Sequence, residues 1–210
     1  MTSSSRIPPK PHHRFSWYAR LFLANQRRRY GKELEPARLW ARTPKVFAAL
    51  SLLYGALDRR SSPIEPALRS LITVRVSQIN WCAFCVDINS ATGLKRGVSE
   101  AQLAALAGFE TSPLFDPRQK AALAYAEAMT RTDAGVDDAL MARLKSHFDD
   151  DAVIELTALV AFQNMSSKFN AALAVAPQGF CRSGPSPGAA PRAGETAPGS
   201  GRPDVIERPG

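Results

Sequence analysis

The stretch LRSLITVRVSQINWCAFCVDIN, residues 68–89, decides how the rest of the chain is read. Its β-branched residues are compatible with a strand. A pattern of three- and four-residue steps nevertheless runs through Leu68, Leu71, Ile72, Arg75 and Ile79. That period predicts a helix ending near Asn80. Cys82 and Cys85 follow at once and begin a second predicted helix that ends near Arg96. The stretch therefore predicts two consecutive helices with a cysteine pair at the start of the second.

Helices are predicted on both sides of this stretch. The signals at their starts are capping residues, such as Ser99 in a capping box and Asp116 before a proline. The last predicted helix is apolar on nearly all sides, so we expect it to be central and buried. Trp81, Phe84 and Phe162 are expected in the core. The predicted helices cover residues 15–30, 44–57, 99–108, 116–130, 137–147 and 149–175, and the fold class is all-α.

Composition divides the chain into four parts. Residues 1–13 are polar and contain prolines, so we expect a disordered lead. Residues 14–35 are expected to form a basic amphipathic arm, with Trp17, Leu21 and Ala24 on one spacing and Tyr18 and Phe22 beside them. Residues 36–180 form the predicted helical domain, and residues 181–210, rich in proline, glycine and alanine, are expected to be a disordered tail.

The net charge of +8 comes from the arm. Eight of the 27 basic residues lie in residues 1–32, which contain no acid, so the rest of the chain has 19 basic and 19 acidic residues. A neutral body argues against nucleic-acid binding. The arm has two interpretations, contact with an anionic membrane surface or packing on the body or a neighbouring subunit, and we favour packing. No apolar run suggests a secretory signal or a membrane span, so we expect a cytoplasmic protein.

The cysteine pair indicates redox chemistry. Unpaired N–H groups at a helix start favour the thiolate of Cys82 or Cys85, and the two-residue spacing lets the second sulfur close a disulfide. The alternatives are half of a zinc site and simple packing. A structural zinc site needs four ligands, and the other candidates are far away in the sequence and not paired at ligand spacing. Those candidates are Cys181, His147, His12 and His13.

Residues 68–89 resemble the core motif of the carboxymuconolactone decarboxylase/AhpD-like (alkylhydroperoxidase D) superfamily. LKRGVS at 94–99, AALAYA at 121–126 and the helix from Ile154 to Asn170 match its continuation, so that the resemblance covers roughly residues 36–176. It implies an all-helical fold, assembly as a homo-oligomer (trimer or larger), and reduction of a small peroxide or disulfide. It also implies an external dithiol donor and neither a metal nor an organic cofactor. Cys85 would be oxidised by the peroxide, and Cys82 would be proton donor and disulfide partner.

The chain departs from the resemblance at two positions. Active members place a glutamate twelve residues before the first cysteine and a histidine four residues after the second, where this sequence has Ser70 and Asn89. Neither side chain accepts a proton as a general base does. The alternative function is therefore a non-catalytic or weakly active helical oligomer that acts as a redox sensor or binds a partner. A lactone decarboxylase-like enzyme is a third hypothesis that rests on the superfamily name alone.

Two carboxylates complete the candidate site. Asp87 follows Cys85 by two residues, and the simpler interpretation is that it complements the helix dipole. Glu155 lies on an otherwise apolar helix face, so it is either paired with a cation or lines the site.

Overall fold

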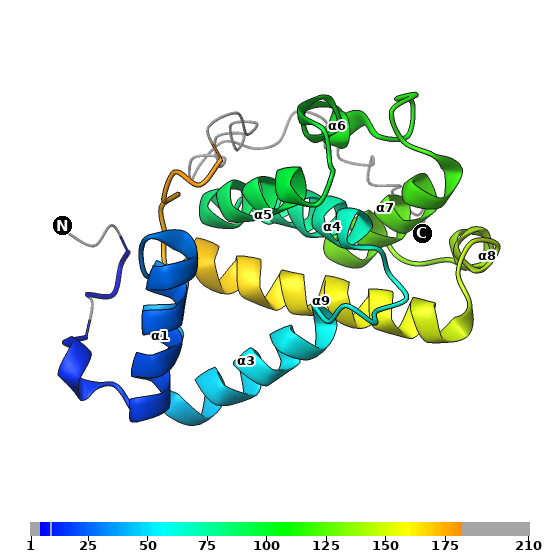
Figure 1. Cartoon of the computed structure of the whole chain (residues 1–210). Coiled ribbons are helices and arrows are strands. Elements are labelled where there is room, and N and C mark those ends of the chain that lie inside the picture. Colours follow the sequence, from blue (N-terminus) through cyan, green and yellow to red (C-terminus); the bar gives the residue numbers. More distant parts are fainter. Residues whose placement is uncertain (1–4, 9, 182–210) are drawn as a thin grey trace, which may run out of the picture.

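The computed structural model describes residues 5–8 and 10–181, and every regular element in this part of the chain is a helix (Figure 1). The predicted all-α class is confirmed. The α-helices are α1 (Trp17–Tyr30), α2 (Glu35–Trp40), α3 (Pro44–Leu57), α4 (Pro66–Ile79), α5 (Ala83–Lys95), α6 (Glu100–Ala105), α7 (Pro117–Thr130), α8 (Asp138–Lys145) and α9 (Asp150–Ala172). Two short 3-10 helices are η1 (His12–Arg14) and η2 (Leu106–Gly108).

Local capping chemistry sets the starts of four helices. Ser99 and Asp116 each form a capping box with a glutamine three residues later, at the starts of α6 and α7. Asp137 and Asp149 each accept a backbone N–H bond of 2.8 Å in the first turns of α8 and α9. A cap of this kind contributes about 1 kcal/mol. These four starts agree with the starts predicted from the sequence.

Helices α4–α9 form a body around one aliphatic core. Helix α4 lies at its centre and contacts α5, α7 and α9. Figure 1 shows α4 and α5 above the long α9, with α8 at the far end of α9. Leu71, Ile72, Val74 and Val76 of α4 are fully buried. Burial of one such side chain contributes about 1.5–3 kcal/mol, so α4 is the element that holds the body together.

The junction between α4 and α5 places the cysteine pair. Helix α4 ends in a Schellman motif, in which the Cys82 N–H bonds to Ser77 O at 3.0 Å and the Trp81 N–H to Gln78 O at 3.2 Å. Trp81 therefore has a φ of 54°, in the left-handed region that usually favours glycine. The chain turns at Trp81, and the next residue is already the N-cap of α5.

Two expectations about the core are wrong. Trp81 is about half exposed, because the left-handed turn directs it away from the helices that flank it, and Phe162 is only partly buried, whereas Phe84 is buried as expected. Helix α9 is amphipathic rather than enclosed: Leu156 and Val160 are buried, whereas Ile154 is 68% exposed. Helix α9 is covered by α4, α5 and α7 and is contacted by α3 and α8, and the face that carries Ile154 remains exposed.

Helices α1–α3 form a second unit, the cap; Figure 1 shows α1 at one end of the body and α3 below α9. Helix α1 packs on α3, where Phe22 meets the ring of Phe47 edge to face at 5.0 Å. The covered face carries Ala19 and Leu23, whereas Trp17 and Leu21 of the predicted stripe are 67% and 63% exposed. Sequence periodicity thus identified the helix and part of its covered face: Tyr18 and Phe22 pack against the buried cluster, whereas Trp17, Leu21 and Ala24 are exposed. Helix α2 was not predicted, because six residues are too short for a clear period.

The two ends of the described chain lie against the body. The Arg6 N–H bonds to Leu173 O at 2.9 Å, so this part of the predicted lead is held by the end of α9. Residues 173–181, hereafter the strap, return along α5 after α9 ends. The predicted tail lies outside the described residues, except for Cys181. None of the described helices is both long enough and apolar enough to cross a membrane.

Candidate active site

Cys82 and Cys85 form a disulfide at the first turn of α5. Cys82 is the N-cap residue, and its Sγ accepts a hydrogen bond of 3.1 Å from the Cys85 backbone N–H. The N–H groups of a helix start favour negative charge on the atoms they face. Both cysteines are buried. The predicted disulfide-forming pair therefore lies at a helix start, inside the protein.

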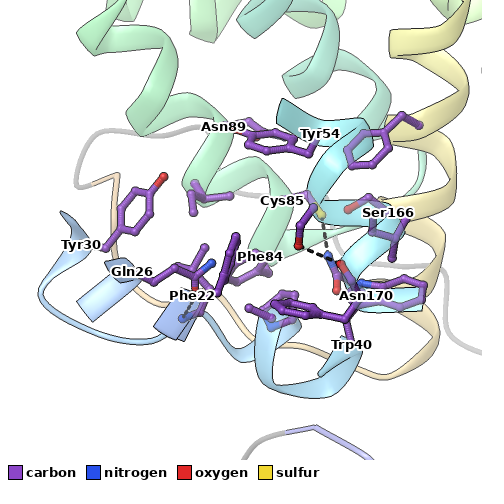
Figure 2. A pocket seen from close by; sticks show the side chains of 18 of the residues that line it. Phe22, Gln26, Tyr30, Trp40, Tyr54, Phe84, Cys85, Asn89, Ser166 and Asn170 are labelled. Atoms are coloured by element: carbon purple, nitrogen blue, oxygen red, sulfur yellow. Dashed lines mark hydrogen bonds between the residues drawn. The ribbon is translucent and has the colours of Figure 1, made fainter. Parts of the chain in front are cut away.

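A cavity of about 400 Å³ lies between the cap and the body (Figure 2). Ligand pockets in proteins have volumes of this order. Cys85 lines the cavity, whereas Cys82 is not among its lining residues. A molecule in the cavity therefore meets the pair from the Cys85 side. The aromatic side chains of the wall are Phe22, Tyr30, Trp40, Phe47, Tyr54, Phe84 and Phe162.

Asn170 of α9 makes a side-chain hydrogen bond to Cys85, the cysteine that lines the cavity. Its Nδ2 donates to Cys85 Sγ at 3.2 Å, as the dashed line in Figure 2 shows, and its Oδ1 is buried without a partner. The sequence analysis missed this role. The signal was present, because Gln163, Ser167 and Asn170 are uncharged polar residues at helical spacing on a largely apolar helix, and all three are buried.

Ser70 and Asn89 make their hydrogen bonds to groups other than the sulfurs. Asn89 Nδ2 donates to Ser77 Oγ at 3.3 Å, and Ser70 Oγ donates to the Pro66 carbonyl at 3.1 Å. Helices α4 and α5 approach closely here, since a Cβ on Gly93 would lie 3.4 Å from Ser70 Cβ. Ser70 and Asn89 both line a smaller cavity of about 40 Å³, hereafter the annex.

Asp87 holds the strap. Its carboxylate accepts backbone N–H bonds from Gln178 and Phe180 at 2.8 Å and from Cys181 at 2.7 Å. Asp87 lines neither the cavity nor the annex. Its contact with three backbone donors is a structural role beyond the dipole interaction expected from its position.

Glu155 is paired. Its carboxylate accepts hydrogen bonds from Arg59, at 2.5 Å, and from the Ser62 hydroxyl. It lies outside the residues that line the two cavities. Of the two alternatives for Glu155, the structure therefore favours the ion pair.

Metal ligands do not gather in the described part of the chain: no three histidine, cysteine or carboxylate side chains there come together to hold an ion. Cys181, a free and partly exposed thiol, is anchored through its backbone to Asp87 on α5.

Comparison with known proteins places the chain among helical relatives. Residues 44–128 match the family model of the carboxymuconolactone decarboxylase family. The protein YnjA of Escherichia coli (strain K12), described as uncharacterized, is 46% identical over 156 residues, which span 74% of this chain and 86% of YnjA.

Two solved structures share the fold. The first is an alkylhydroperoxidase AhpD core, an uncharacterized peroxidase-related protein from Ralstonia eutropha JMP134. It superposes with a TM-score of 0.77 and 21% identity, and the matched part spans 86% of this chain and 96% of that protein. The second is a variant of the debrominase Bmp8 in complex with 2,3,4-tribromopyrrole. It superposes with a TM-score of 0.73 and 19% identity, and the matched part spans 86% of this chain and 95% of that protein. At these identities the likeness shows the fold alone.

Proposed function

The chain belongs to the carboxymuconolactone decarboxylase family, and within it we propose that the protein is a thiol-dependent oxidoreductase that reduces an organic hydroperoxide at Cys85. One observation carries the proposal: Cys85 lines an aromatic cavity, whereas its disulfide partner Cys82 does not. A peroxide in the cavity therefore reaches Cys85 first. The apolar wall favours an organic hydroperoxide over hydrogen peroxide, because it buries the hydrocarbon part.

The reaction balances in three steps. The Cys85 thiolate attacks the terminal oxygen of ROOH, the O–O bond breaks, and the leaving alkoxide takes the proton of the Cys82 thiol, which gives ROH and a Cys85 sulfenic acid. The Cys82 thiolate then attacks the Cys85 sulfur and forms the disulfide, and hydroxide leaves and takes a proton from solvent as water. An external dithiol reduces the disulfide and is itself oxidised to a disulfide.

The amide of Asn170 supports the first step. Its Nδ2–H points at Cys85 Sγ, and a hydrogen bond to the charged form of an acid favours that form. The helix start acts in the same direction. Together these donors stabilise the Cys85 thiolate, but neither of them accepts the thiol proton as a general base would.

The competing proposal is a redox sensor that reacts once and turns over slowly. The lack of a general base beside Cys85 favours this proposal. The side chain that contacts the sulfur is the amide of Asn170, and Ser70 and Asn89 donate their hydrogen bonds to other groups. A positioned general base typically contributes about 10²–10⁴-fold to a rate. The two proposals differ in the number of turnovers, not in the disulfide that forms.

The deciding experiment measures turnover. Purified protein with cumene hydroperoxide and excess dithiothreitol should consume many equivalents of hydroperoxide per chain, and Cys85→Ser should consume none. The matched variant Cys82→Ser, reduced and then freed of dithiothreitol, should stop at a Cys85 sulfenic acid after one equivalent of hydroperoxide, which dimedone traps and mass spectrometry detects. A single equivalent consumed by the wild type would support the sensor. A Cys85→Ser variant as active as the wild type would refute both proposals.

A further inference from the structure

The annex adjoins the cavity, and neither cysteine lines it. The two spaces share the lining residues Tyr54, Asn89, Thr92, Phe162 and Gln163. Space of roughly 10–15 Å³ is enough for one water molecule, so an annex of about 40 Å³ accommodates a small polar group. The cavity and the annex are therefore adjoining spaces, and the annex differs from the cavity in the charged side chains that line it beside apolar ones.

The annex carries one positive charge in excess. Three charged side chains line it: Asp58, Arg69 and Arg96. One Nη of Arg96 lies 2.8 and 2.7 Å from the two carboxylate oxygens of Asp58, and Arg69 lies 3.6 Å from the same carboxylate. One carboxylate thus faces two guanidinium groups. A compartment with this balance attracts an anion.

Arg69 is the guanidinium that lacks a full set of acceptors. Its exposed fraction is 4%, and its Nη1 donates to the Arg59 carbonyl at 2.9 Å. Its Nε is buried with no hydrogen-bond partner. A charged donor left unpaired away from water is costly, so an additional acceptor in the annex would be stabilising.

Helix α5 sets the distance between the two compartments. Cys85, Asn89, Thr92 and Arg96 follow one another at steps of four, three and four residues, so they lie on one face. At about 1.5 Å per residue, Thr92 lies about 10 Å and Arg96 about 16 Å from Cys85 along the axis. A single ligand of that length can place one end at the sulfur and the other in the annex.

We propose that the annex binds the carboxylate of an amphipathic substrate whose aromatic or acyl body fills the cavity. The cavity supplies apolar surface, and the annex supplies the guanidinium groups of Arg69 and Arg96, of which that of Arg69 has an unpaired Nε–H. That the ligand is a substrate rests on the proposed function, whereas its binding does not.

One other cation lines the cavity and provides the control. Arg29 of α1 is exposed and belongs to the cap side of the wall, and it does not line the annex. Water screens an exposed ion pair, so it contributes less to binding than one formed in a partly enclosed site. The proposal therefore requires that the carboxylate preference depends on Asp58 and Arg96 and not on Arg29.

The test is a titration of the oxidised protein, in which the disulfide is intact and no turnover occurs. Phenylalkanoates of increasing chain length and their methyl esters are titrated by calorimetry. The acids should bind about tenfold more tightly than the esters once the chain spans the two compartments. Arg96→Gln should remove most of that preference, Asp58→Asn should increase it, and Arg29→Gln should leave it unchanged. The opposite signs for Arg96→Gln and Asp58→Asn separate a charge effect from unfolding, which would weaken acid and ester alike.

Equal binding of acids and esters, or loss of the preference in Arg29→Gln, would overturn the annex proposal. This outcome is separate from the turnover assay. If the protein prefers acids but consumes no hydroperoxide, the annex proposal stands and the proposed function is refuted. If it turns over hydroperoxide but binds acids and esters equally, the proposed function stands and the annex proposal is refuted.

Discussion

The body and the cap use their apolar side chains in different ways. In the body, fully buried aliphatic residues such as Leu71, Leu123 and Leu156 form one core. In the cap, the buried cluster is small and combines Phe15 and Phe47 with short side chains, and large apolar residues of α1 and α3 remain exposed. The cap contributes most of the aromatic wall of the cavity. The buried core of the body thus supplies most of the stability, and the cap supplies most of the aromatic surface that a ligand would contact.

This difference separates two kinds of function. The cysteines and Asn170 belong to the body, where packing holds them at a set distance. The aromatic residues that a ligand would contact come largely from the cap. Substitutions in the body should therefore change stability or thiol chemistry, and substitutions in the cap should change ligand binding.

The largest effect is expected in the core of the body. Leu71→Ala removes a side chain with no exposed surface and should lower the free energy of unfolding by about 2–5 kcal/mol. The matched variant Leu52→Ala removes the same atoms from an exposed position of the cap and should change it by no more than about 0.5 kcal/mol. Urea unfolding measures both. Equal effects would contradict the division between body and cap.

The next effect concerns the strap. Asp87→Asn replaces a carboxylate that accepts three backbone N–H bonds and turns one acceptor into a donor, so unfolding free energy should fall by about 1.5–3 kcal/mol. Protease should then cleave the strap before the body. Asp133→Asn, in an exposed loop, is the control. A strap that stays resistant in Asp87→Asn would show that its apolar contacts suffice.

Asn170→Leu tests the thiol chemistry of the body. The amide N–H donates to Cys85 Sγ and would stabilise the thiolate of the reduced protein, so alkylation of Cys85 by iodoacetamide should need a higher pH once the amide is removed. Asn25→Leu, at the cap side of the same cavity, should leave the pH profile in place. An unchanged profile in Asn170→Leu would assign thiol activation to the helix start alone.

The smallest effect is expected from a ring of the cap. Trp40 stacks on Phe169 of α9 with ring centroids 3.7 Å apart and lines the cavity. Trp40→Leu should weaken binding of a phenylalkanoate methyl ester by about 0.5–1.5 kcal/mol, the usual contribution of an aromatic contact beyond its area. Calorimetry measures the binding, and the Cys85 alkylation profile should not move. A shift of that profile would show that cap and thiol are coupled.

Much of the fold follows from local sequence. The starts of α6, α7, α8 and α9 were predicted because a capping residue acts on backbone groups within one turn. Helix α3 was predicted from Pro44 to Leu57, the bounds that the structure has. The domain boundaries at residues 14, 36 and 181 remain predictions.

The errors fall where long-range packing decides. The face of α1 that is covered depends on Phe47, which lies on another helix, so its own period was insufficient. Trp81 was expected in the core because large aromatic residues usually are, but the turn that starts α5 places it at the surface. The contact of Asn170 with Cys85 joins residues 85 positions apart, and no local rule predicts such a pair.

The sequence by itself determined most of the helices and the place of the cysteine pair at a helix start, because these depend on neighbours within a few turns. It also determined that the positions of Ser70 and Asn89 lack a side chain that acts as a general base, because this depends on residue type alone. Only the tertiary structure decided that Cys85 and not Cys82 lines the cavity, that an amide from α9 contacts its sulfur, and that two arginines and one carboxylate line the annex. These features depend on how α3, α4, α5 and α9 pack against one another, and that packing is the sum of many weak contacts between distant segments.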